Sequence, residues 1–452
     1  MPTSSKPDIA KLAFAFSCLL LVFGAGFSVR HFEMLPYRIL RSGVAAVRQV
    51  FAERSTLTGV RPQELTQPAR RVGKGITVNK AGQTQPGLTF ITSFFDSGNE
   101  MRLVRLDGSV VHRWPVKFFE IFPNRDHVDK ADLPQSEWNL DVHGSLALPD
   151  GSIVFNFEGL GSVKLDRCGT VQWTLPRITH HSIERSQDGG FWIPSGTLLK
   201  KDSPFPALTP PYFNEKILKV SAEGKVLREL SVLQILFKNH MEAHLFTNGL
   251  YGIKLASNDL THLNDVEELD SSMASAFPQF RAGDLLVSLR NLNMVMVVDP
   301  LTEKVKWHQV GPWIKQHDPD FLASGKIAVL ANNDDGSPTG TILGGSKIIE
   351  TNPATGENTV RYGDGPNQNW YSFRRGKIQY LPNGDILIAD SESGRVVEIN
   401  PAGEIVWEFI NRYDDKFVAV IRGATRYPED YFTVKDWSCN VLRSNNPAQG
   451  EK

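Results

Sequence analysis

The chain has 452 residues, 41% of them hydrophobic and 22% charged, which is enough apolar material for a sizeable core. Its 49 Lys and Arg are matched by 50 Asp and Glu, so the formal charge of −1 gives no sign of a polycationic surface and we expect no nucleic-acid partner. The 37 Gly and 27 Pro favour many short strands joined by turns.

The first predicted element is an N-terminal membrane anchor within residues 1–30. Residues 12–29 carry no charge and reach the lower length limit for crossing a bilayer. A cleaved signal peptide would have a shorter apolar core and a small-x-small cleavage site. The sequence therefore favours an uncleaved signal anchor with a transmembrane helix, which makes the membrane a partner. A cleaved signal peptide is the alternative.

Residues 31–87 are predicted to be an amphipathic helix followed by a linker. Between Pro36 and Glu53, apolar residues recur at helical spacing with arginines between them, which is typical of a helix on a membrane surface. Residues 54–87 contain Gly, Pro, Gln and Thr, as linkers do.

Beyond residue 87 a repeat dominates the sequence. Its clearest copy, at 379–410, has two apolar strands, turns at Pro382–Gly384 and Asn400–Gly403, and a last strand that ends near Trp407. Six copies can be traced, at 103–114, 146–173, 183–230, 280–307, 321–362 and 379–410. This period predicts an all-β, six-bladed β-propeller over residues 88–432, with a C-terminal tail at 433–452.

Smaller features complete this prediction. The first copy lacks a strand, and we expect residues 423–432 to pair with it and close the ring, which removes an exposed sheet edge. Segment 231–247 is predicted to be a helical insertion between the third and fourth copies. Cys168 and Cys439 form either one disulfide or two separate thiols. Tryptophans at matching positions are expected to pack between blades: Trp114, Trp173, Trp307 and Trp407.

Several histidines share one place in the repeat, a few residues before the predicted innermost strand of a blade. That strand lines the central channel of a propeller, so side chains there should converge on the axis. Arg290 follows a strand taken as the innermost of copy four, and Asn291 is beside it. The candidates are His143, His180, His181, His262 and His317, whereas His112, His127, His240, His244 and His308 are off this phase and are interpreted as surface or satisfied residues.

Four segments carry a resemblance to a known family. THHSIERSQDGG, THLNDVEEL, LLVSLRNLNMVMVVDP and KQHDPDFLASGKIAVLANNDDG resemble bacterial PAPS-independent arylsulfotransferases, and the resemblance covers roughly residues 140–410. It implies transfer of a sulfuryl group from an aryl sulfate to a phenol, without a cofactor. His317 would be the sulfurylated nucleophile, and His181, His262 and Arg290 would hold the sulfate.

The resemblance leaves other assignments open. His180 is an alternative to His181, and His143 and Asn291 are further substrate-binding candidates. Little room exists before residue 87 for the N-terminal β-sandwich of the family, and an anchor replaces its secreted form. We expect a membrane-anchored relative with its propeller on the periplasmic or extracytoplasmic side, and the oligomeric state is not predicted.

The proposed residue types suit this chemistry. Neutral imidazole is a nucleophile near neutral pH, and a guanidinium fork fits the oxygens of a sulfuryl group. Asp318 either fixes the tautomer of His317 or is a turn residue.

Two rival interpretations are a four-histidine metal-dependent oxygenase and a non-enzymatic binding scaffold. Arg290 argues against a metal, because a guanidinium repels a divalent cation, so we expect no metal ligands.

Overall fold

The computed structural model describes residues 9–31, 56, 61–96, 98–130, 132–246 and 259–439. Residues 1–63 and 64–452 form two separate compact units, which are taken one at a time. The predicted amphipathic helix at Pro36–Glu53 lies outside the described residues.

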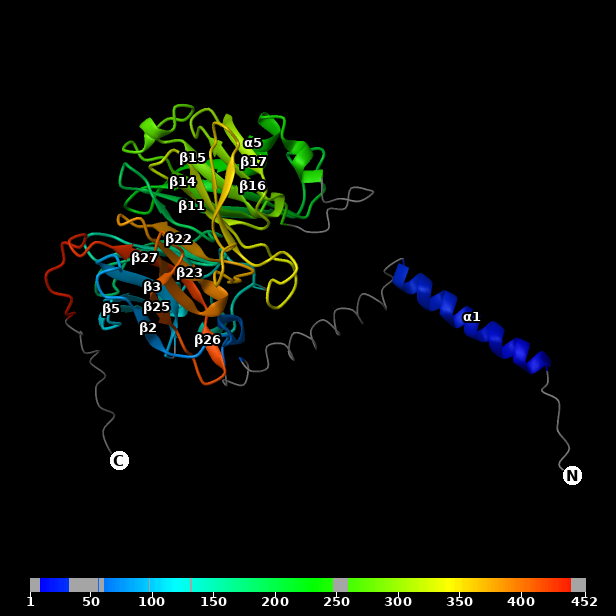
Figure 1. Cartoon of the computed structure of the whole chain (residues 1–452). Helices are drawn as coiled ribbons and strands as arrows, with labels where there is room; N and C mark the ends of the chain where they lie inside the picture. Colours follow the sequence, from blue (N-terminus) through cyan, green and yellow to red (C-terminus); the bar gives the residue numbers. More distant parts are fainter. Residues whose placement is uncertain are drawn as a thin grey trace, which may run out of the picture. The chain divides into compact units, whose positions relative to one another are not determined.

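The described part of the first unit is dominated by helix α1, Ile9–His31 (Figure 1). Its side chains are mostly exposed, and its most apolar window has a mean hydropathy of 2.2. The helix is long and apolar enough to cross a membrane, and an N-terminal signal sequence would have the same properties.

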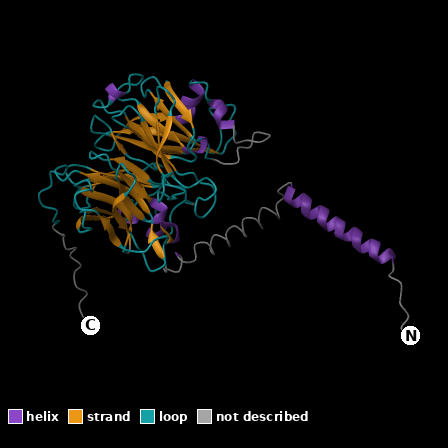
Figure 2. Ribbon diagram, viewed as in Figure 1, coloured by secondary structure: helices purple, strands orange, loops and turns teal. Residues whose placement is uncertain are grey.

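The second unit is a six-bladed β-propeller, as predicted, and its regular secondary structure is nearly all strand (Figure 2). Each blade has four antiparallel strands, ordered from the channel outward, and a fifth strand adds to the outer edge of the sixth blade. The first three blades comprise β27 (Ile421–Tyr427), β3 (Leu88–Phe95), β4 (Gly98–Val104) and β5 (Val110–Pro115); β6 (Val142–Ala147), β7 (Ile153–Phe157), β8 (Gly161–Leu165) and β9 (Val171–Leu175); and β10 (Glu184–Arg185), β11 (Phe191–Leu199), β12 (Tyr212–Val220) and β13 (Val226–Ser231).

Blades four to six repeat this arrangement. Their strands are β14 (Leu263–Glu268), β15 (Leu285–Leu289), β16 (Met294–Val298) and β17 (Val305–Val310); β18 (His317–Phe321), β19 (Ile327–Ala331), β20 (Lys347–Thr351) and β21 (Asn358–Tyr362); and β22 (Lys377–Tyr380), β23 (Ile386–Asp390), β24 (Arg395–Ile399) and β25 (Ile405–Ile410).

The middle strands of the blades are the most apolar because neighbouring blades cover both of their faces. All five residues of β15 and of β16 are buried, whereas β17 alternates between partly buried and exposed positions. Tryptophans bind adjacent blades as predicted: the indole of Trp407 donates to Leu106 O at 2.9 Å, and that of Trp173 donates to Ala222 O at 3.0 Å. The hydrophobic core is therefore a ring of blade-to-blade contacts.

Short helices lie in the connections. Ser231 caps α5, its hydroxyl accepting from Gln234 N, and the apolar residues of α5 join the core cluster shared by blades three and four. The predicted helical insertion is thus found as α5 and η3. Among the described residues from Gln63 onward, the helices are α4 (Phe118–Ile121), α5 (Val232–Lys238), η1 (Gln63–Leu65), η2 (Glu137–Asn139), η3 (Glu242–Phe246), η4 (Ala274–Ala276), η5 (Arg290–Leu292) and η6 (Ser391–Ser393).

The two ends of the propeller chain are tied together. Strand β27 pairs with β3, with Ala424 opposite Ile91, so the predicted closure is confirmed, with the strand ending at Tyr427 (Figure 1). Residues 64–87, expected to be linker, also contribute strands. β2 (Gly75–Asn79) adds to the outer edge of blade six, and β1 (Thr66–Pro68) pairs with β26 (Phe417–Ala419).

A disulfide between Cys168 and Cys439 resolves the alternative that the sequence left open. Their Cα atoms are 5.5 Å apart, and 271 residues separate them in sequence. The bond fastens the segment after β27 to the turn between β8 and β9 in blade two. That blade is next to blade one, in which β27 closes the ring.

Loss of this disulfide should destabilise the propeller without disturbing the channel. We expect Cys168→Ser to lower the free energy of unfolding by about 2–5 kcal/mol, because the cross-link restricts a long loop in the unfolded chain. Urea unfolding of the full chain in detergent measures the change. Cys18→Ser, at the exposed free cysteine of α1, is the control, and equal stability of the two variants would contradict the expectation.

Candidate active site

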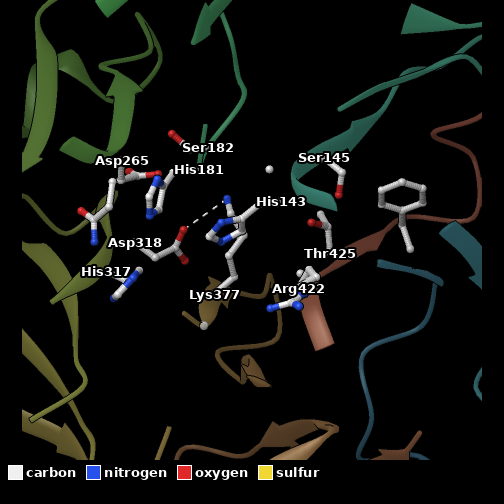
Figure 3. A pocket seen from close by; sticks show the side chains of 15 residues that line it. His143, Ser145, His181, Ser182, Asp265, His317, Asp318, Lys377, Arg422 and Thr425 are labelled. Carbon is white, nitrogen blue, oxygen red and sulfur yellow. Dashed lines mark ion pairs between the residues drawn. The ribbon is translucent and has the colours of Figure 1, made fainter. Parts of the chain in front are cut away.

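The inner strands surround an axial cavity with a free volume of about 20 Å³, roughly the space of one water molecule (Figure 3). Three of the candidate histidines, His143, His181 and His317, line it. The rest of the lining is mostly polar and comes from all six blades, and it includes Ser145, Ser182, Asn264, Asp265, Asp318, Lys377, Arg422 and Thr425.

The histidine rings form one cluster around His181. The ring centroid of His181 lies 4.8 Å from that of His143, 4.9 Å from that of His262 and 6.4 Å from that of His317. Nδ1 of His180 lies 3.0 Å from Nδ1 of His181, but His180 is not part of the cavity lining. His181 is therefore the member of the pair that meets the other candidates.

Local backbone geometry turns these side chains toward the axis. His181 and His262 have φ angles of +54° and +51°, a conformation that non-glycine residues adopt at a cost of about 1–3 kcal/mol. Irregular register at the start of β6, β14, β18 and β27 re-aims side chains in the same way. Gly144 permits close contact of two blades, because a Cβ there would lie 1.7 Å from His181 O.

Asn332 orients the ring of His317. Its Nδ2 donates to Ser372 O and to Arg375 O, both at 2.7 Å, so its Oδ1 must face the imidazole. Nδ1 of His317 donates to that oxygen at 2.7 Å, which leaves Nε2 with a free lone pair. Burial and the charge of Arg290 hold the pKa of His317 well below its usual value, so the ring is neutral at pH 7.

His262 has a carboxylate partner instead. Its Nδ1 donates to Asp259 Oδ2 at 2.5 Å, and about a quarter of its side chain is exposed. Glu215 holds the segment around it, accepting from the Thr261 hydroxyl and from Leu263 N. Burial and the charge of Asp259 raise the pKa of Glu215 to about 7. His262 is not part of the cavity lining and lies beside it, against His181.

Glu158 contacts both His143 and His181. Its Oε2 accepts from His143 Nδ1 at 3.2 Å and from the backbone N–H of His181 at 2.9 Å, and Oε1 lies 3.3 Å from His181 Nδ1. Burial opposes ionisation, but these partners lower the pKa of Glu158 to about 2. The three groups offer ligand atoms within 4.8 Å of one another, a spacing that would also suit a metal ion.

Arg290 lies outside the cavity lining. It follows β15, which is the second strand of blade four, so the prediction that this strand is innermost was wrong; β14 is innermost. Its Nη2 lies 3.8 Å from Asp334 Oδ2, and its Nη1 donates to Asn291 Oδ1 at 3.4 Å. Asn291 in turn donates to Asp259 O at 3.0 Å, which ties Arg290 to the loop that carries His262.

Asp318 fills neither of its expected roles. Its Oδ2 accepts from Ile378 N at 2.6 Å and its Oδ1 lies 3.2 Å from Lys377 Nζ, so it joins β18 to β22 while Asn332 serves His317 (Figure 3). None of the described off-phase histidines lines the axial cavity. Two of them are satisfied by carbonyls: Nε2 of His112 lies 2.7 Å from Arg167 O, and that of His127 lies 2.7 Å from Leu160 O.

Comparisons with solved structures give only distant likenesses. A protein of unknown function from Bacteroides caccae is 13% identical, with a TM-score of 0.46, over 72% of this chain and 94% of that one. A virginiamycin B lyase from Staphylococcus aureus is 11% identical, with a TM-score of 0.40, over 77% and 88%. Likenesses this weak say nothing about the function of this chain.

None of the curated proteins compared matches the chain. The family model described as Arylsulfotransferase (ASST) matches residues 144–412. That range is more than half of the sequence, and it contains His181, His262, Arg290 and His317. The chain therefore belongs to the arylsulfotransferase family.

Proposed function

We propose that this protein transfers a sulfuryl group from an aryl sulfate to a phenol through a covalent intermediate on His317. The observation that carries the proposal is the hydrogen bond from His317 Nδ1 to Asn332 Oδ1. It selects the tautomer whose Nε2 lone pair is nucleophilic, and the low pKa of His317 keeps that lone pair free of a proton.

The reaction would proceed in two balanced steps. Nε2 attacks sulfur, an N–S bond forms, and the S–O bond to the aryl oxygen breaks with its electron pair leaving on that oxygen. An acceptor phenol then attacks sulfur, the N–S bond breaks, and its electron pair returns to Nε2. A neighbouring histidine gives a proton to the first phenolate and later accepts one from the second phenol.

His262 suits the proton-transfer role best. Asp259 accepts from its Nδ1 and stabilises the imidazolium that forms, and its partial exposure leaves the ring accessible. Burial and the neighbouring histidines hold the pKa of His181 well below its usual value, so a neutral His181 would donate or accept hydrogen bonds at the sulfuryl oxygens. Arg290 would bind those oxygens from outside the cavity.

We also infer that the propeller lies on an extracytoplasmic side, anchored by α1. The disulfide between Cys168 and Cys439 supports this, because disulfides persist in oxidising compartments and are rare in the cytosol.

Metal-dependent chemistry is a second candidate, favoured by the spacing of His143, Glu158 and His181. Metal analysis of the purified full chain separates the two functions. A stoichiometric metal that is lost in His143→Ala would favour this candidate over sulfuryl transfer.

The covalent step predicts distinct behaviour for the histidines. His317→Ala should abolish the burst of phenol and the sulfuryl adduct, because no other group forms the N–S bond. His262→Ala should slow the reaction by about 10²–10⁴-fold while still forming adduct. Rapid mixing with a chromogenic aryl sulfate, followed by intact-mass analysis, measures both. A normal burst from a stable His317→Ala protein would refute the proposal.

Asn332→Ala should slow the burst because His317 loses the acceptor that selects its tautomer. We expect a fall of about 10- to 100-fold, equivalent to the loss of one buried hydrogen bond at about 1–3 kcal/mol. Asn411→Ala is the matched control, since Asn411 is also buried and donates to Ser93 Oγ and Phe94 O away from the cavity. Equal burst rates in the two variants at equal stability would mean that Asn332 has no orienting role.

The pKa of His317 sets a pH dependence for the first step. Since burial and Arg290 lower this pKa, the neutral nucleophile persists as the pH falls below 6.5, and activity is lost only in more acidic solution. We expect the burst rate with a good leaving group to stay constant from pH 8 to about pH 6. A decline with a midpoint near pH 6.5 would contradict the assignment.

A further inference from the structure

Arg422 is a buried arginine that presents unpartnered donors at the axial cavity. It lies at the irregularity between Ile421 and Gly423 in β27, and only 5% of its surface is exposed. Among the residues that the structure describes, its Nη1 and Nη2 have no hydrogen-bond partner. Buried guanidinium nitrogens are normally satisfied, so two free ones on the same side chain point to a missing anion.

The carboxylate in contact with Arg422 also serves a second arginine. Arg422 Nε lies 2.7 Å from Asp141 Oδ1, while Arg375 Nη2 lies 2.7 Å from Asp141 Oδ2. Burial and the charge of Arg375 lower the pKa of Arg422 to about 10, which leaves it protonated at neutral pH. Asp141 and the more distant Glu392 both pair with Arg375, so they compensate the positive charge of Arg422 only in part.

Arg422 lines the same cavity as His143, His181 and His317, and Figure 3 labels all four side chains. The other cation of the lining is Lys377, whose Nζ lies 3.0 Å from Glu184 Oε1 and 3.2 Å from Asp318 Oδ1. Lys377 is thus occupied by two carboxylates, whereas Arg422 offers a free pair of parallel donors. A guanidinium edge of this kind matches two oxygens of a tetrahedral oxyanion.

We propose that Arg422 is a second anion-binding residue of the sulfuryl-transfer site, whose Nη1 and Nη2 hold oxygens of the sulfate ester and of the sulfuryl group on His317. This rests on the proposed function. Arg290 then acts from outside the cavity and Arg422 from its wall. The two guanidinium groups would stabilise the negative charge on the transferred sulfuryl group from different sides. The family resemblance in the sequence identifies Arg290 as a sulfate-binding candidate and does not identify Arg422.

Binding of inorganic sulfate tests the proposal without catalysis. Sulfate affinity of the full chain in detergent, measured by calorimetry at constant ionic strength, should fall at least tenfold in Arg422→Gln. Arg426→Gln is the matched control: Arg426 lies on the same strand, is 3% exposed and bonds to Glu398 and Thr89 outside the cavity lining. Its loss should leave sulfate affinity unchanged. Unaltered affinity in a folded Arg422→Gln protein, or an equal fall in both variants, would overturn the proposal.

Asp141→Asn provides a second arm that does not depend on the folding of the arginine variant. Removing the carboxylate leaves Arg422 less compensated, so sulfate should bind more tightly. Unchanged or weaker binding in folded Asp141→Asn would overturn the proposal.

Activity measurements show whether a failure lies in this inference or in the proposed function. If sulfate affinity follows the expected pattern but the wild-type chain gives no phenol burst, the anion site stands and sulfuryl transfer fails. If the wild type gives a burst and Arg422→Gln keeps both its sulfate affinity and its kcat/KM, Arg422 alone is misassigned.

Discussion

The closure of the ring by β27 is the constraint on which the site depends. The axial cavity exists only when all six inner strands surround one axis, and the strand that completes the circle comes from the C-terminal part of the chain. The same strand carries Arg422 and Thr425 into the cavity wall. Both ends of the propeller chain reinforce the closure, through β2 on blade six and through the disulfide at Cys439.

The channel that this closure creates is lined mostly by polar residues, because the inner strands face one another across a narrow space. Lys377 lies near the carboxylates of Glu184 and Asp318. Further acids lie close by: Asp265 is buried, and Glu267 and Asp320 are partly buried. Burial, and repulsion between these carboxyl groups, raise the pKa values of the last three well above the usual range. Mutual repulsion and burial thus favour the protonated forms of these three acids, which lowers the negative charge near the axis.

The sequence predicts the fold well because a propeller repeats its turns and apolar strands at a constant period. The position within the repeat also identifies the candidate histidines, which lie at or just before the starts of inner strands. It could have found more: Glu158, Arg290 and Asn332 each directly follow the second strand of a blade, at the ends of β7, β15 and β19. Arg290 was singled out, but applying the same phase to the other blades would have found Glu158 and Asn332.

Other parts of the site lack such a signal. Asp259 lies on the irregular segment before β14, and its link to His262 depends on local backbone geometry rather than on the repeat. Arg422 enters the cavity through a register irregularity, which is not visible in the pattern of apolar residues. The strands β1 and β2 were missed because they add to sheets formed by residues more than 300 positions away.

The partners of the three central histidines give identical side chains different chemistry. An amide oxygen accepts from His317 without adding negative charge, so that ring is orientated while it remains neutral. A carboxylate accepts from His262, so the hydrogen-bond partner of that ring carries a negative charge. His181 shares Glu158 with His143 and lies between the other two rings. In the proposed reaction, the three rings therefore differ in role because each contacts a different partner atom. The repeat places Asn332 and Glu158 at equivalent positions, but it does not determine which residue type stands there.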